Sequence, residues 1–96
     1  MSFSAQYPKL ANFLGAWFPD ADLEGLTDSD VVTAFLAVSD RRTVEEILEE
    51  LQGALADMPL FWEDVANEAN RAFDNSESAA SWLREISVGM IGQANQ

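Results

Sequence analysis

The chain has 96 residues, and 17 Asp and Glu against 5 Lys and Arg give it a formal net charge of −12. Nucleic acids and anionic membranes bind basic surfaces, so this charge argues against both as partners. The chain has neither Cys nor His and therefore lacks thiol nucleophiles, Ser-His pairs and the usual zinc ligands. We expect a protein that is not an enzyme and that holds no metal or cofactor.

The apolar residues recur with a helical period along the whole chain, and no segment alternates as a strand would. With 48% hydrophobic residues, the chain can bury a core, and its length fits one helical domain over residues 1–96. The sequence therefore predicts an all-α fold, a compact single-domain bundle of about five short helices. The first residues have neither the basic nor the apolar region of a signal peptide, and no apolar run approaches the ~20 residues that span a bilayer, so we expect a cytoplasmic protein.

The first helix is predicted over residues 8–18, because Pro8 suits a first helical position. Pro19 should end it, since the residue before a proline is pushed out of the helical region. Residues 20–26 are then a loop. The core face of this helix is formed by Leu10, Phe13, Leu14 and Trp17.

The second helix is predicted over residues 28–39, with Thr27 and Asp30 resembling a capping box that has Asp in place of Glu. Its apolar residues lie around much of the circumference, so we expect it to be the central helix. They are Val31, Val32, Phe35, Leu36 and Val38.

The third helix should open with the capping-box pair Thr43 and Glu46 and run to about residue 57. Its apolar residues form one narrow stripe: Val44, Ile47, Leu48, Leu51 and Leu55. Four carboxylates on the opposite side form what we call the carboxylate ridge: Glu45, Glu46, Glu49 and Glu50.

The fourth helix is predicted to begin at Pro59 and to end near residue 73. Its core face is Phe61, Trp62, Val65, Ala66, Ala69 and Phe73. The side expected to face water is Glu63, Asp64, Asn67, Glu68 and Arg71. After a polar break at residues 74–78, the last helix frays beyond residue 92, and its core face is Ala79, Trp82, Leu83, Ile86 and Met90.

Residues 20–25 match the calcium loop of an EF-hand at its first, third, fifth and sixth positions, through Asp20, Asp22, Glu24 and Gly25. The twelfth position needs a Glu that supplies two oxygens, and it is occupied by Val31. We therefore expect a solvated acidic loop rather than a metal site. A degenerate calcium-binding module stays an alternative, which calorimetry with calcium would test.

The excess of acidic residues is compatible with binding to a basic protein. Like charges four residues apart on a helix cost a few tenths of a kcal/mol, and a surface with so few cations suits steering toward a basic protein. Charge alone leaves partner binding and simple solubility equally good explanations. The residues that we predict for partner binding are Glu45, Glu46, Glu49 and Glu50, with Asp20, Asp22 and Glu24 as a second patch.

The N-terminal part of the chain contains the segment Tyr7-Pro8-Lys9-Leu10-Ala11-Asn12-Phe13-Leu14-Gly15-Ala16-Trp17-Phe18. After it come Asp20, Asp30-Val31-Val32, Phe35-Leu36 and later Trp82-Leu83. This pattern resembles the immunity proteins of bacterial contact-dependent growth inhibition systems. The resemblance implies a non-catalytic inhibitor that binds the toxic C-terminal domain of a delivered exoprotein in the cytoplasm. Such toxins are often nucleases, whose basic clefts suit an acidic inhibitor. The alternative is an acidic helical adaptor or oligomerising subunit without a toxin partner.

Overall fold

The computed structural model describes residues 2–94, and their side chains except at positions 20, 22, 23 and 94. Within this part of the chain every regular element is a helix, so the all-α prediction is confirmed. Six helices are present rather than about five: α1 (Phe3–Gln6), α2 (Pro8–Glu24), α3 (Asp28–Val38), α4 (Arg41–Ala56), α5 (Met58–Ala69) and α6 (Ser76–Ala94). The additional one is the short α1, which Ser2 caps by accepting a hydrogen bond from the backbone N–H of Ala5.

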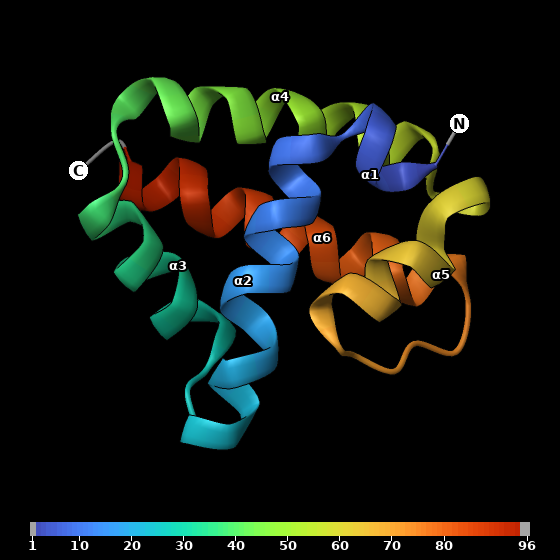
Figure 1. The fold of residues 1–96 in the computed structure, drawn as a ribbon, viewed down its shortest axis with the longest axis horizontal. Helices are drawn as coiled ribbons and strands as arrows, with labels where there is room; N and C mark the ends of the chain where they lie inside the picture. Colours follow the sequence, from blue (N-terminus) through green and yellow to red (C-terminus); the bar gives the residue numbers. More distant parts are fainter. Residues whose placement is uncertain (1, 95–96) are drawn as a thin grey trace.

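The central helix is α6, which packs against α3, α4 and α5. It runs beside α4 in the opposite direction, as the change of colour along both helices in Figure 1 makes clear. The expectation that residues 28–39 form the central helix is therefore wrong. Helix α3 buries Val31, Val32 and Phe35, but its last residue, Val38, is 73% exposed.

One hydrophobic core receives side chains from all six helices. The predicted core faces are largely confirmed, with Leu10, Leu14, Leu51, Val65 and Leu83 fully buried. Trp17 and Trp62 are half-buried at the edge of this core, whereas Trp82 is buried. No helix within residues 2–94 combines the length and apolar composition that crossing a bilayer requires.

Helix α2 continues through Pro19, so the predicted helix end and the loop at residues 20–26 are wrong. Phe18 and Ala21 are both buried, and burying this pair compensates for the hydrogen bond that proline cannot donate. The helix ends instead at Glu24. Gly25 follows it with a φ of 73°, which suits glycine, and the N–H of Leu26 is bonded to the carbonyl of Ala21 at 2.9 Å. The calcium-loop pattern at positions 20–24 therefore lies on a helix.

The predicted capping box of α3 is confirmed: Thr27 accepts from the N–H of Asp30 at 3.1 Å, and Asp30 accepts from the N–H of Thr27 at 3.0 Å. The capping box predicted at Thr43 and Glu46 is wrong. Asp40 caps α4 by accepting from the N–H of Thr43 at 2.7 Å, so the helix begins at Arg41.

Helix α5 ends earlier than predicted, at Ala69, because Asn70 adopts a left-handed conformation with a φ of 54°. Phe73 therefore follows the helix rather than closing it, although its side chain still packs against the core. Helix α6 in turn begins at Ser76, inside the predicted polar break.

Candidate functional site

The carboxylate ridge does not form one surface. Glu45 and Glu49 are exposed, whereas Glu46 and Glu50 are partly buried on the side of α4 that packs against α2. Glu46 forms an ion pair with Lys9 of α2 and a second one with Arg42, in which the Nε–Oε1 distance is 3.1 Å. Half of the ridge is thus engaged in contacts within the protein.

Glu50 completes the N-terminus of α2. Its Oε1 atom accepts hydrogen bonds from the backbone N–H groups of Lys9 and Leu10, both at 3.0 Å. The first N–H groups of a helix have no partner within the helix, and the helix dipole favours a negative charge beside them. Glu50 therefore serves as the cap of α2, although it is 40 residues away from Leu10 along the chain.

The same side of α4 continues with Gly53 and Asp57. The Tyr7 hydroxyl donates a hydrogen bond to Asp57 at 2.5 Å, and a Cβ atom placed on Gly53 would lie 3.0 Å from the Tyr7 ring. The hydrogen bond to the Asp57 carboxylate, followed by burial, raises the pKa of Tyr7 above its usual value of 10.0. We call Glu46, Glu50, Gly53 and Asp57 the inner flank of α4.

Glu45 and Glu49 point away from this flank. Glu45 pairs with Arg41, one helical turn earlier, at 3.2 Å, and both side chains are largely exposed. Such solvent-exposed pairs contribute little free energy, so a basic partner can compete for Glu45 at small cost. Glu49 is exposed and has no ion pair within the described part of the chain.

The second predicted patch lies at the C-terminal end of α2. Glu24 is exposed there. Asp20 and Asp22 belong to the same helix, but their side chains lie outside the described residues. The partner-binding role of this patch stays a prediction, as it does for the ridge.

Arg71, which we expected to face water, is partly buried and contacts other parts of the protein. Its Nη2 atom lies 2.8 Å from Asp28 Oδ1, and its guanidinium sits 5.8 and 5.6 Å from the ring centres of Phe18 and Trp82. The indole N–H of Trp82 donates to the other Asp28 oxygen at 2.8 Å. These contacts join α2, α3 and α6 to the segment after α5, so Arg71 and Asp28 act within the fold.

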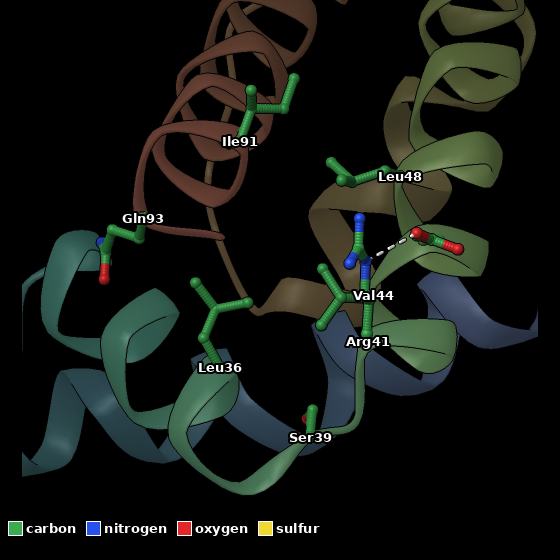
Figure 2. Close-up of a pocket in the computed structure, with 8 residues that line it drawn as sticks. Leu36, Ser39, Arg41, Val44, Leu48, Ile91 and Gln93 are labelled. Atoms are coloured by element: carbon green, nitrogen blue, oxygen red, sulfur yellow. Dashed lines mark hydrogen bonds and ion pairs between the residues drawn. The ribbon is translucent and has the colours of Figure 1, made fainter. Parts of the chain in front are cut away.

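A groove that the sequence patterns do not predict lies where α3, α4 and α6 meet. It has a volume of about 500 Å³, and its lining is Leu36, Ser39, Arg41, Val44, Glu45, Leu48, Ile91 and Gln93. Figure 2 shows Leu36, Val44 and Leu48 pointing into the same space, with Ile91 bordering it from α6. The exposed Val88 and Ile91, outside the predicted core face of the last helix, were the available signal.

Chemically, this half of the molecule offers an apolar groove beside exposed carboxylates. Among the described residues, no three Asp or Glu side chains gather as a metal site would require. The arrangement therefore suits binding of another molecule through apolar contact and negative charge.

Comparison with known proteins agrees with the resemblance seen in the sequence. A family model described as CdiI immunity protein matches residues 6–89. No curated protein and no solved structure matches the chain. Because the matched region covers α2 to α5 and most of α6, it includes both the carboxylate ridge and the greater part of the groove. The chain belongs to the CdiI immunity protein family.

Proposed function

We propose that this protein binds the toxin domain at the C-terminus of a contact-dependent growth inhibition exoprotein and neutralises it in the bacterial cytoplasm. The observation that carries the proposal is the family match over residues 6–89. The protein acts by association rather than by catalysis, and its partner is the toxin made by the same strain.

The charge of the protein supports a nuclease as the toxin. A nuclease binds phosphates through Lys and Arg, so the surface around its cleft is basic and complements a protein with a net charge of −12. Glu45 and Glu49 supply negative charge directly to the approaching toxin, and Asp20, Asp22 and Glu24 form the second attracting patch. Glu46 and Glu50 contribute to the field of the ridge while they hold α2.

The function is tested by co-expression with a candidate toxin domain, the C-terminal domain of a contact-dependent growth inhibition exoprotein from the same genome. Cells that express the toxin domain should stop growing, and cells that also express this protein should recover. The two purified proteins should form a stable complex in size-exclusion chromatography. Growth arrest without recovery, together with no complex, would reject the proposal.

The role of charge is tested by the association rate. The double variant Glu45→Lys, Glu49→Lys should bind the toxin domain about ten-fold more slowly at low salt, and its association rate should depend less on ionic strength. The control is Glu63→Lys, Asp64→Lys on α5, two exposed acids whose replacement changes the net charge equally. Equal slowing in both variants would mean that total charge, and not the ridge, steers the toxin.

A further inference from the structure

Charge can steer a toxin, but it does not by itself explain a tight complex. The centre of a stable protein interface is apolar, and a few buried anchors supply most of its binding free energy. If the proposed function holds, the surface should therefore offer an apolar site close to the exposed carboxylates of α4.

The groove between α3, α4 and α6 meets this requirement. Leu36, Val44 and Leu48 form its apolar wall, and Ile91, 44% exposed, borders it from α6 (Figure 2). Its volume of about 500 Å³ is enough to hold one or two side chains of a partner.

Three exposed aliphatic side chains stand on the helices that border this groove: Ile91 within its lining, and Val38 and Val88 outside that lining. Val38 ends α3 and is 73% exposed, and Val88, one turn before Ile91 on α6, is 70% exposed. The other large apolar residues exposed in the described part of the chain are Leu26 and Leu60, which stand on different segments. Exposed aliphatic side chains on two neighbouring helices, one of them in the lining of a groove, indicate a contact surface better than a single exposed side chain does.

The charge beside the groove determines which partner fits it. Glu45 belongs both to the groove lining and to the exposed half of the ridge, and Glu49 follows one turn later on α4. Among the described residues of the lining, Arg41 is the one cation, and Glu45 already pairs with it at 3.2 Å. The exposed charge that remains is negative, so the groove complements an apolar anchor flanked by Lys or Arg.

We propose that this groove is the docking site of the toxin domain, which inserts an aliphatic or aromatic side chain between Leu36, Leu48 and Ile91 and places a neighbouring Lys or Arg against Glu45 and Glu49. This inference rests on the proposed function, since the occupant is the toxin. It assigns affinity to the groove and association rate to the ridge.

The test replaces the exposed aliphatic residues without touching the core. The triple variant Val38→Gln, Val88→Gln, Ile91→Gln is compared with the control Leu26→Gln, Leu60→Gln, in which the replaced residues are also exposed but stand away from the groove. Unfolding midpoints in urea establish that both variants are folded. Calorimetry measures their affinity for the toxin domain that the co-expression experiment identifies, and sedimentation velocity measures the size of each protein alone.

The triple variant should bind the toxin domain at least about 30-fold more weakly, mainly through faster dissociation, as expected for lost interface anchors. The control should stay within about two-fold of the wild type. If the wild type binds tightly and the triple variant binds equally well, the groove assignment is wrong while the proposed function stands. If the wild type does not bind at all, the proposed function itself fails.

Sedimentation adds a separate way to reject the assignment. A wild-type dimer that the triple substitution converts to a monomer, with toxin affinity unchanged, would make the groove an interface between two copies of this chain. A monomeric wild type together with the expected loss of affinity supports the toxin as the occupant.

Discussion

The two sides of α4 differ in what they contact. On the inner flank, Glu46 forms an ion pair with α2 and Glu50 accepts hydrogen bonds from it. Asp57 accepts a hydrogen bond from the hydroxyl of Tyr7. On the other side, Val44 and Leu48 face a groove that α3 and α6 do not fill. The exposed Glu45 and Glu49 stand between these two sides.

This difference shows that a row of carboxylates on one helix need not share one purpose. Glu49 and Glu50 are neighbours in the chain, yet one is exposed and the other caps a helix. The inner flank should therefore matter for stability, and the groove side for binding. Four substitutions around α4 test this difference, with expected effects on stability that decrease from Gly53 to Asp40.

The largest effect is expected at Gly53. A valine there would press its Cβ against the Tyr7 ring, which cannot move aside easily because it is bonded to Asp57 and packed against Phe3 and Phe61. Gly53→Val should lower the free energy of unfolding by about 2 kcal/mol, measured by urea denaturation. Gly89→Val is the matched control, because nothing lies within 4 Å of a Cβ atom at Gly89. Similar losses in both variants would show that helix propensity alone explains them.

Glu50→Ala removes the acceptor of two backbone N–H groups at the start of α2. The free energy of unfolding should fall by about 1–2 kcal/mol, the usual cost of losing a helix cap. Glu49→Ala should change it by less than about 0.5 kcal/mol, as exposed substitutions usually do. Equal effects of the two substitutions would contradict the division of the ridge.

Tyr7→Phe removes only the hydroxyl that donates to Asp57. We expect a loss of about 1 kcal/mol near neutral pH, measured by the same denaturation assay. The pKa of Tyr7 is raised in the folded protein, so this contribution is fully present below the unfolded value of 10.0 and is lost as the pH rises through the folded pKa. The stability difference between wild type and variant should therefore shrink in alkaline solution, and a constant difference would contradict this explanation.

The smallest effect is expected at Asp40, the exposed cap of α4. The hydrogen bond from the backbone N–H of Thr43 lowers the pKa of Asp40, so its contribution to stability is present above the unfolded value of 3.8 and is lost as the pH falls through the folded pKa. Asp40→Asn keeps the capping acceptor but removes the titration. The variant should match the wild type at neutral pH and lose less stability in acid, which thermal unfolding across this pH range would measure.

Local patterns in the sequence predicted the structure correctly where the structure of a segment depends on residues within that segment. The helical period placed Leu10 and Leu14 on one buried face, and the pair Thr27 and Asp30 predicted a real capping box. Such features depend on residues three or four positions apart, which are neighbours in any helix. The family resemblance is likewise visible without a structure, because it depends on the order of residues alone.

Local rules failed where a distant residue or the core overrode a local preference. Pro19 was expected to end a helix, but the burial of Phe18 and Ala21 keeps α2 continuous. Arg71 was expected to face water, but its guanidinium pairs with Asp28 and lies over two aromatic rings. Neither outcome can be read from a helical period, because the period does not say which segments meet.

The order and type of the residues are enough to predict the all-α class, the apolar faces of the helices, the excess of negative charge and the family. Which carboxylates are exposed, and where the apolar groove lies, follows only from how the helices pack. The physical reason is that charge and hydrophobicity belong to single residues, whereas exposure depends on which helices pack together. Glu50 caps a helix and Glu49 stays exposed only because α2 packs against the side of α4 on which Glu50 lies.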